Sequence, residues 1–356
     1  MPEAGEVLPG VRTIAVLRPN AVGDFIFALP ALHALRAAYP SARIVYIGKP
    51  WHAEFLRDRP GPVNEVAVIP PCPGVGAPLQ QACDARAIDD FVAALLAADI
   101  DLALQLYGGG RYANPFIRRL GARLTVGLKA QDAEPLDRWI AYAALQNKRL
   151  LLLEAAALAG ARRLELGREL EVTEHDRAEA ARVMRPATGQ SLVLIQPGSS
   201  DARRRWPAHS FARVADALAA EGAAVAVHGT AAEAGVVRDV IGQMRRPAFD
   251  LSGKISLAGL CGLLERSALL VSNDTGPLHL ALAIGTPAVG IYWLTNLHES
   301  GPLLQDRHRA ALAVRTHCPV CGEENLRRRC PHDESFVADV PVGEVTELAL
   351  ELLRNR

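Results

Sequence analysis

The stretch Ser272-Asn273-Asp274-Thr275-Gly276-Pro277-Leu278-His279 directly follows the apolar run Ala268-Leu269-Leu270-Val271. The run predicts a short buried strand. The proline predicts that a helix begins at Gly276-Pro277, because its missing N–H would be unpaired in a first helical turn anyway. The free N–H groups and positive dipole end of such a helix suit a diphosphate. Asp274 and His279 then stand where they can contact a sugar or phosphate; alternatively, Asp274 or Thr275 caps the helix and His279 faces solvent.

The alternation of strand and helix seen there runs through the whole chain. Apolar runs that predict strands lie at 13–17, 43–48, 66–69 and 102–106, with helical patterns at 26–35, 91–98 and 150–159. After a polar stretch at 171–190, strand-like runs recur at 192–195, 223–227, 269–271 and 287–292, with helical patterns at 211–220 and 257–264. This order predicts an α/β protein with two parallel sheets, each covered on both faces. Ligands are expected outside the carboxyl ends of the strands.

Composition narrows the class of protein. A chain of 356 residues favours two domains, and equal numbers of basic and acidic residues argue against a general nucleic-acid binder. The sequence contains no apolar run long enough to span a bilayer, and residues 1–7 lack the features of a secretory signal. We therefore expect a cytoplasmic protein with at most transient contact with the inner membrane. The basic, partly apolar segment 118–129 is the candidate for that contact.

A second polar loop, Asn20-Ala21-Val22-Gly23-Asp24, follows the first predicted strand. Gly23 permits a tight turn or a close approach of backbone. Asp24 stands at the mouth of the first sheet, where a carboxylate can act as general base by taking a proton from a substrate hydroxyl. The alternative is that Asp24 caps a helix running from Phe25.

A third loop, residues 196–207, follows the strand at 192–195 and holds Ser199, Ser200 and three consecutive arginines. Small hydroxyl residues and backbone N–H groups can face a phosphate there. Arg204 or Arg205 can clamp it through a bidentate guanidinium, although a run of arginines is also typical of a solvated surface.

A further loop at 228–233 ends in Glu233, which can hold the hydroxyls of a sugar or ribose, although Glu is favoured in any first helical turn. The chain has no phosphate-binding loop ending in Gly-Lys-Ser/Thr. It also lacks a spaced glycine fingerprint after the first strand. These absences weaken kinase-like and dehydrogenase interpretations.

Taken together, these loops resemble glycosyltransferase family 9, the heptosyltransferase family. The resemblance runs from Val16 to about Val342, and it is carried by the stretches 17–24, 196–207, 251–254 and 272–279. It implies the GT-B fold, which consists of two facing Rossmann-like domains with an interdomain cleft. The donor, usually ADP-heptose, would lie on the C-terminal domain, and the acceptor on the N-terminal domain beside Asn20 and Gly23.

The resemblance also implies roles for individual residues. Asp24 would deprotonate the acceptor hydroxyl, which displaces the nucleoside diphosphate with inversion and without any cofactor or metal in the reaction. The donor-binding residues would be Ser199, Ser200, Arg204, Arg205, Glu233, Asp274, Thr275, Gly276 and His279. Arg204 stands where the family typically has Lys; this change keeps the charge but alters reach, and it leaves a different donor sugar open as an alternative.

The expected domains are an acceptor domain at 1–172, a linker at 173–190, a nucleotide-sugar domain at 191–341, and a C-terminal helix at 342–356 that packs back on the first domain. The first choice of acceptor is a lipopolysaccharide core sugar. A protein hydroxyl and a small metabolite stay open as acceptors. A GT-B-fold sugar-nucleotide epimerase and a non-catalytic nucleotide-sugar binder are the alternative functions.

Three of the six cysteines cluster near the C-terminus. Cys318-Pro319-Val320-Cys321-Gly322 has the form of a metal knuckle, and Cys330-Pro331-His332 follows it closely. Three thiolates and one imidazole complete a tetrahedral zinc-type site, here structural rather than catalytic. Some relatives in the family bind iron through cysteines in this region. Ser335 stands where such chains can carry a fourth cysteine, and the alternative is a loop of reduced surface thiols.

Overall fold

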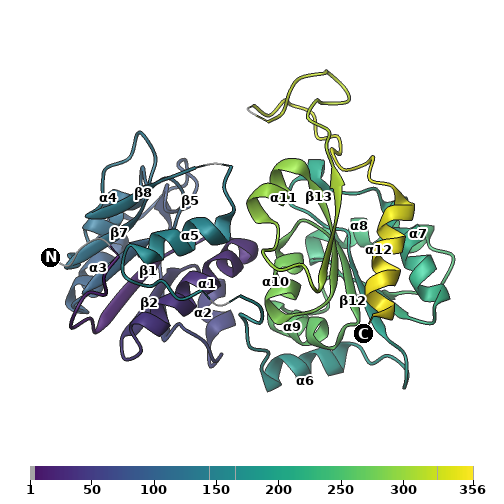
Figure 1. Ribbon diagram of the computed structural model, residues 1–356, viewed down its shortest axis with the longest axis horizontal. Coiled ribbons are helices and arrows are strands. Elements are labelled where there is room, and N and C mark those ends of the chain that lie inside the picture. The colour runs from purple at the N-terminus through teal and green to yellow at the C-terminus, as the bar shows by residue number, and fades with distance from the viewer. Residues whose placement is uncertain (1–4, 144, 165, 327, 356) are drawn as a thin grey trace. The chain divides into compact units, whose positions relative to one another are not determined.

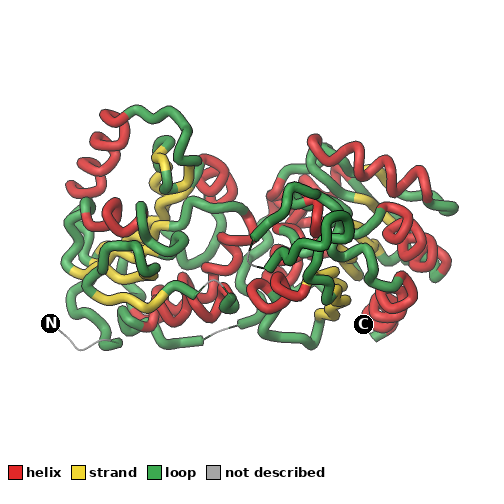
Figure 2. Tube along the Cα trace, turned by 90° about the horizontal axis from the view of Figure 1, so that it is seen from above, coloured by secondary structure: helices red, strands yellow, loops and turns green. Residues whose placement is uncertain are grey.

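The computed structural model describes residues 5–143, 145–164, 166–326 and 328–355. Residues 1–4 and 356, which the expected domain limits include, lie outside the described residues. The chain forms two compact units, residues 1–171 and 172–356. Each unit is an α/β layer structure in which strands alternate with helices (Figures 1 and 2).

The first unit contains one six-stranded parallel sheet in the order β3-β2-β1-β6-β7-β8. Its strands are β1 (Thr13–Leu17), β2 (Arg43–Gly48), β3 (Glu65–Val68), β6 (Leu102–Gln105), β7 (Leu124–Lys129) and β8 (Arg138–Ala141), and β4 (Cys72–Pro73) pairs with β5 (Gly76–Ala77). Its helices are α1 (Val22–Ala38), α2 (Pro50–Leu56), α3 (Ala85–Ala97), α4 (Ala113–Arg118) and α5 (Lys148–Ala157). Helices α3 and α4 bury their apolar sides on one face of the sheet, while α1 packs beside α5.

The second unit repeats this design, with the sheet order β11-β10-β9-β12-β13-β14. Its strands are β9 (Leu192–Gln196), β10 (Ala224–Val227), β11 (Phe249–Asp250), β12 (Leu269–Asn273), β13 (Ala288–Trp293) and β14 (His308–Ala313). Its helices are α6 (Glu174–Val183), α7 (Ala208–Ala220), α8 (Ala234–Gln243), α9 (Leu257–Arg266), α10 (Gly276–Ile284), α11 (Leu294–Ser300) and α12 (Val342–Arg354), with short 3₁₀ turns at Ala202–Arg204 and Ala231–Glu233.

The central strands of both sheets are mostly apolar, with polar residues only at their ends, because both of their faces are covered. Every residue of β1, β9 and β12 is buried. In the second unit, alternate residues of these strands pack against α7, α8 and α12 on one face. Such continuous apolar runs are the pattern of parallel sheets, which is why they are readable from the sequence.

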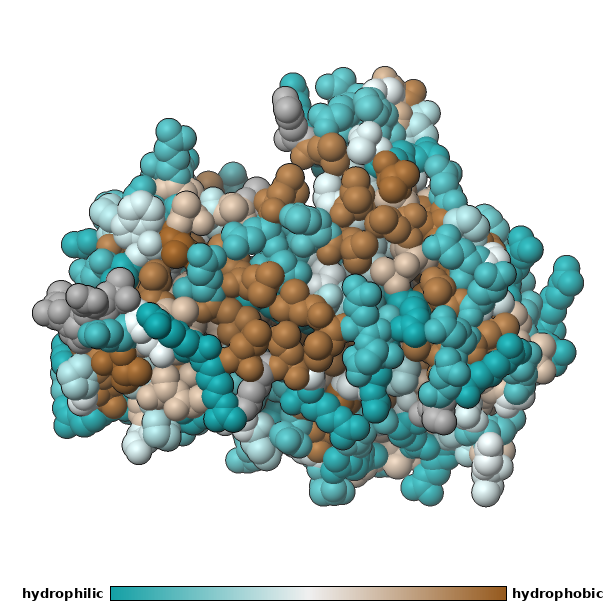
Figure 3. All heavy atoms as spheres, in the orientation of Figure 1, coloured by the Kyte–Doolittle hydropathy of each residue, from teal (hydrophilic) through white to brown (hydrophobic). Residues whose placement is uncertain are grey.

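The segment 173–190, expected as a linker, is mostly the helix α6. Thr173 caps its N-terminus in a capping box with Asp176, and the helix packs closely on α9. Gly262 of α9 has no side chain there, and a Cβ would overlap the carbonyl oxygen of Asp176. The outer side of α6 is hydrophilic (Figure 3), and this polar surface is what the linker interpretation rested on. This correction extends the second unit back to Val172.

The C-terminal helix also differs from its expected position. Residues 342–354 form α12, which belongs to the second unit and packs on α7, β12, β13 and β14. Val345, Ala349 and Leu352 are buried in that unit's core. The apolar stripe of the helix therefore covers the sheet of its own unit, whereas packing on the first domain was expected from the sequence.

The basic segment 118–129 is the end of α4 followed by β7, a strand whose residues 124–128 are buried. Because these apolar residues are buried in the sheet, they are not accessible to a bilayer, so this half of the segment does not form the expected membrane contact. Among the described residues, no helix is both long enough and apolar enough to cross a membrane.

Candidate functional site

The polar loops of the second unit leave neighbouring strands at one edge of the sheet. Strands β9 and β12 run parallel, with Ser272 beside Gln196, so the loops that follow them begin side by side. Asn273 ties the two loops together: its side-chain Nδ2 donates to the carbonyl of Pro197 at 2.8 Å, and its Oδ1 accepts from the N–H of Trp206 at 3.0 Å. The sequence stretches around 199 and 274 therefore build one site.

Asp274 is the centre of this site. Its side chain is only 3% exposed, and its carboxylate contacts His279 Nε2 at 2.9 Å and an Arg204 nitrogen at 3.4 Å. Ser300 Oγ of α11 donates to the same carboxylate at 3.0 Å. Burial raises the pKa of Asp274, but the hydrogen bond and charge of His279, the charge of Arg204 and the hydrogen bond of Ser300 outweigh it and lower the pKa below its ordinary value. Asp274 is thus an ionised, cross-linked anchor, and His279 is buried rather than solvent-facing.

The three consecutive arginines have three different environments. Arg203 is engaged internally by the Asp201 carboxylate at 2.7 Å, and Arg205 Nε donates to the carbonyl of Ser199 at 2.8 Å. Arg204 reaches toward Asp274, and its buried Nε has no hydrogen-bond partner among the described residues. A buried guanidinium N–H without a hydrogen-bond acceptor destabilises the folded protein unless a ligand accepts from it. Arg204 is therefore the arginine best placed to clamp an anion.

The N-terminus of α10 opens beside Arg204. Thr275 is the N-cap residue and makes no side-chain cap bond, and Gly276 is the first helical residue. The N–H of Gly276 makes no hydrogen bond within the described residues, whereas the next donors along the helix, Leu278 and His279, bond back to Thr275. The unbonded Gly276 N–H, the Thr275 hydroxyl and the helix dipole together favour a phosphate at this point.

The remaining predicted residues of this unit line the same edge of the sheet. Ser199 is buried and Ser200 is exposed. Glu233 accepts from the N–H and hydroxyl of Thr230 through Oε2, both at 2.9 Å. A Cβ on Gly198 would overlap the other Glu233 oxygen, so the loops at 198 and 233 touch. The glycine leaves room for the carboxylate.

A buried pair below Glu233 was not predicted. His228 Nδ1 lies 2.5 Å from the Gln196 side-chain oxygen, at the carboxyl ends of β10 and β9. Burial lowers the pKa of His228 to about 4, while the Glu233 charge acts in the opposite direction. The imidazole is therefore neutral at physiological pH. The sequence signal that could have identified this pair is position: Gln196 and His228 are each the polar residue that directly follows a predicted apolar strand.

In the first unit, Asp24 lies in the first turn of α1, which begins at Val22 rather than at Phe25. Its carboxylate does not cap the helix. Instead, Oδ1 pairs with Arg18 at 2.9 Å, and the buried Arg18 also donates to the backbone oxygens of Asp24 and Leu106. About a third of the Asp24 side chain, 32%, is exposed. A fixed carboxylate with one oxygen engaged and an accessible surface is suited to accept a proton.

The two other predicted residues of this loop are less distinctive. Gly23 is an ordinary residue of the first turn of α1 and is absent from the glycines with positive φ, so a tight turn does not explain it. Asn20 has a buried Oδ1 with no partner among the described residues. This oxygen lies four residues before Asp24 in the sequence and can accept a hydrogen bond from a ligand hydroxyl. Arg18, which orients Asp24, was not singled out by the sequence.

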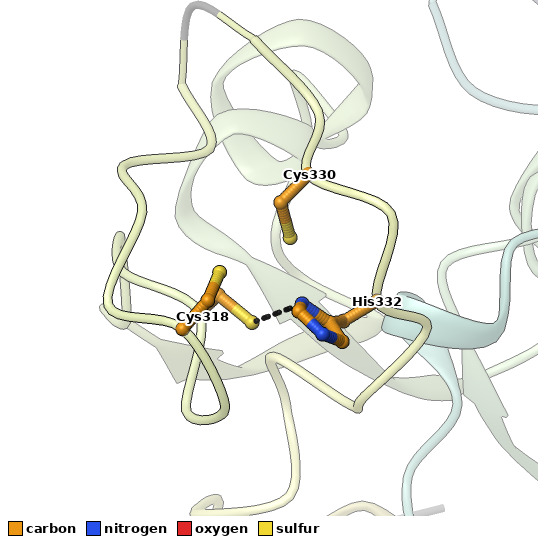
Figure 4. A group of neighbouring side chains, drawn as sticks. Cys318, Cys330 and His332 are labelled. Carbon is orange, nitrogen blue, oxygen red and sulfur yellow. Dashed lines mark hydrogen bonds between the residues drawn. The ribbon is translucent and has the colours of Figure 1, made fainter.

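The cysteine cluster forms in the second unit, in the loop between β14 and α12. The ligand atoms of Cys318, Cys321, Cys330 and His332 all lie within 4.8 Å of one another. Figure 4 shows Cys318, Cys330 and His332 converging, with Cys318 Sγ 3.7 Å from His332 Nδ1. Tetrahedral zinc with bonds of about 2.3 Å to sulfur and about 2.0 Å to nitrogen places such atoms about 3.5 Å apart. The donor set therefore fits a zinc- or iron-type ion.

The surroundings of the cluster supply hydrogen bonds to two of its sulfur atoms. The N–H of Val320 donates to Cys318 Sγ, and Asn325 Nδ2 donates to Cys330 Sγ, both at 3.4 Å. The Asn325 hydrogen bond, followed by the bonds from His332, lowers the pKa of Cys330 to about 6. Ser335 is not part of the cluster: its hydroxyl donates to the carbonyl of Arg205 at 2.7 Å.

Comparison with known proteins gives a consistent result. The family model for glycosyltransferase family 9 (heptosyltransferase) matches residues 92–328, well over half of the chain. Lipopolysaccharide heptosyltransferase 2 of Salmonella typhimurium is 24% identical over 305 residues, which cover 82% of this chain and 85% of that protein.

Solved structures are similar over the whole chain. The family 9 glycosyl transferase of Veillonella parvula has a TM-score of 0.83 at 20% identity, covering 99% of this chain and 100% of that one. TibC of enterotoxigenic Escherichia coli, an iron-containing dodecameric heptosyltransferase solved with ADP-D-beta-D-heptose, has a TM-score of 0.56 at 15% identity and covers 98% and 78%. The fold is thus the GT-B-like heptosyltransferase fold that the sequence predicted.

Proposed function

Because this chain belongs to glycosyltransferase family 9, we propose that it transfers heptose from ADP-heptose to an acceptor hydroxyl with inversion. The single observation that carries the proposal is the edge formed by Arg204, Asp274 and the N-terminus of α10. It combines a half-buried arginine whose buried Nε has no hydrogen-bond partner among the described residues, an ionised carboxylate anchor, and the N–H of Gly276, which makes no hydrogen bond within those residues. These are the groups that a nucleoside diphosphate needs.

The donor would be held by groups with separate tasks. Thr275, Gly276 and Arg204 would bind the diphosphate, with Ser199, Ser200 and Arg205 lining the same loop. His279 and Asp274 would contact the sugar or phosphate. Glu233, whose loop touches Gly198, would take the ribose hydroxyls. When the bond between the anomeric carbon and the diphosphate oxygen breaks, Arg204 and the helix dipole would stabilise the charge that develops on the leaving group.

Asp24 would be the general base of the first unit. The hydroxyl proton of the acceptor passes to its carboxylate as the acceptor oxygen bonds to the anomeric carbon, and the nucleoside diphosphate leaves with the bonding electrons. Arg18 would fix the carboxylate through its Oδ1 contact, and Asn20 would receive a neighbouring hydroxyl through its unpartnered oxygen. General-base catalysis of this kind contributes about 10²- to 10⁴-fold. No metal takes part in this scheme.

A lipopolysaccharide core sugar is the proposed acceptor. The names of the matching curated proteins, lipopolysaccharide heptosyltransferase 2 of Salmonella typhimurium among them, support it. The cysteine cluster, in turn, is proposed as a structural zinc or iron site, supported by its donor set and by the iron-containing relative. A metal bound there would supply a rigid cross-link of the loop between β14 and α12.

The test offers the protein ADP-heptose together with a truncated lipopolysaccharide core, a hydroxyl-bearing protein and a small sugar, each in separate reactions. ADP release and the mass of the product are measured in each. We expect a heptosylated core and no product with the other two. Transfer to the protein or to the small sugar instead would show that the proposed acceptor is wrong and would identify the other one. ADP-heptose consumption without transfer, or no consumption at all, would contradict the transferase activity.

A further inference from the structure

The cysteine cluster and the phosphate-clamping loop are physically joined. The segment 316–337, here called the thiol segment, contacts the loop 197–207 through three hydrogen bonds. Asn325 Oδ1 accepts from Arg203 at 3.3 Å, the N–H of Phe336 donates to the carbonyl of Arg203 at 2.8 Å, and Ser335 Oγ donates to the carbonyl of Arg205 at 2.7 Å. These bonds bracket Arg204 on both sides in the sequence.

Asn325 lies between the two groups. It is 6% exposed, and its Nδ2 donates to Cys330 Sγ at 3.4 Å, while its Oδ1 accepts from the N–H of Cys330 at 3.3 Å. The same Oδ1 accepts from Arg203. One amide side chain thus contacts a metal-ligand candidate and the arginine loop at once. Partners of this kind fix the orientation of the groups they join.

Arg203 passes the constraint on. The Asp201 carboxylate binds its guanidinium at both Nε and a terminal nitrogen, and the guanidinium lies 5.8 Å above the ring of Trp293. That ring packs against Phe336 of the thiol segment at 4.9 Å. These contacts fix the Arg203 side chain. The position of the adjacent Arg204 therefore depends on the contacts that hold Asn325 and Phe336 in place.

We infer that metal in the Cys318, Cys321, Cys330 and His332 cluster sets the position of Arg204 through Asn325 and Arg203, and thereby the affinity for the nucleoside diphosphate. Asn325 is a positioning residue for this binding. The inference rests on the proposed donor site, which it deepens: the cluster acts on donor binding while Asp24, in the other unit, is untouched.

The experiment uses the full-length chain, loaded with metal or stripped by a chelator, with the metal content measured by mass spectrometry. ADP affinity is measured by calorimetry in both forms. Loss of correct placement of one charge-assisted clamp predicts about 5- to 20-fold weaker ADP binding after stripping. Kinetics with ADP-heptose should show a raised donor KM and little change in kcat, because the base is elsewhere.

Two variants identify the route. Asn325→Ala keeps all four ligands; it should retain one metal per chain, weaken ADP binding about as much as stripping does, and show no further loss when stripped. Ser335→Ala removes the half-buried hydrogen bond to the carbonyl of Arg205 and should weaken ADP binding by about 2- to 5-fold. Leu326→Ala, at an exposed neighbour of Asn325, is the matched control and should change neither metal content nor affinity.

A second readout separates this inference from the proposed function. Hydrogen exchange of residues 199–206 should slow on metal loading, whether or not ADP is the correct nucleotide. If the loaded protein does not bind ADP but the exchange slows, the proposed donor is wrong and the coupling stands. If the protein binds no metal, or if stripping and Asn325→Ala leave both exchange and ADP affinity unchanged, the inference is overturned.

Discussion

Strand β1 of the first unit and strand β9 of the second occupy equivalent places in two sheets of the same order. The loops that follow them and their neighbours carry opposite chemistry. After β9 and β12 stand Arg204 and a buried, cross-linked Asp274. The loop after β6, the equivalent of β12, is the neutral stretch Gly108-Gly109-Gly110.

This difference shows how one scaffold makes two kinds of site. In the second unit, charges are buried and mutually bound, which prepares an anion site before the ligand arrives. In the first unit, the Asp24 carboxylate is partly exposed and is oriented by the buried Arg18. We therefore expect the second unit to control binding and the first to control chemistry.

The largest expected effect is on turnover. Asp24→Asn preserves shape and removes the base, so kcat with ADP-heptose should fall by about 10³-fold. The variant is measured by ADP release at saturating donor, and its circular dichroism and melting temperature should match the unaltered chain. Asp132→Asn, at an exposed carboxylate of the same unit, is the control. Undiminished kcat in Asp24→Asn would remove Asp24 from the chemistry.

The next effect concerns donor binding. Arg204→Met keeps the length of the side chain and deletes its charge, so the donor KM should rise by about 10- to 100-fold, as expected for the loss of a charge-assisted hydrogen bond. Arg204→Lys should recover about half of the lost binding free energy, because it restores the charge without the fork. Arg213→Met on the exposed side of α7 is the control. Equal KM values for Arg204→Met and Arg213→Met would exclude a clamp.

The two units should respond alike to acid, because each contains a buried histidine with a lowered pKa. Burial lowers the pKa of His52 to about 3 and that of His228 to about 4. In the unfolded chain both protonate near pH 6.5, so between pH 6.5 and 4 the unfolded state binds more protons and stability falls as the pH falls. Each histidine should cost about 2 kcal/mol at pH 5.

Urea unfolding at pH 7.5 and pH 5.0 measures this loss. His52→Asn and His228→Asn place an amide near each Nδ1 position, and each should flatten the pH dependence by about 2 kcal/mol. A pH dependence that neither substitution changes would show that other groups cause it.

The smallest effect tests where the second unit begins. Gly262→Ala forces a methyl group into the backbone of α6 and should lower the free energy of unfolding by at least about 1 kcal/mol. Gly242→Ala, at an exposed position of α8 with nothing within 4 Å of a Cβ, should be neutral or slightly stabilising. If both substitutions behave alike, α6 does not pack on α9 as the structure shows.

Patterns that depend on local chemistry were readable from the sequence. The buried strands β1, β9 and β12 are apolar runs with polar residues only at their ends, and the start of α10 at Gly276 follows from its proline. The polar ends of parallel strands also predicted that the residues around 199 and 274 share an edge, because parallel strands end together.

The features that escaped prediction depend on distant partners. Ser300 reaches Asp274 from α11, 26 residues away, and Arg18 orients Asp24 by a side-chain bond that no spacing announces. The α6 segment reads as a linker because its buried face is made of small residues and polar caps rather than large apolar ones. Which of the three adjacent arginines keeps a donor without a partner depends on tertiary hydrogen bonds alone.

Calorimetric titration of ADP into the unaltered chain, Asp24→Asn and Arg204→Met tests the division between binding and chemistry most directly. The account predicts that Asp24→Asn binds ADP within about twofold of the unaltered chain and that Arg204→Met binds about 10- to 100-fold more weakly. Equal weakening in both variants, or no binding of ADP by the unaltered chain, would contradict it.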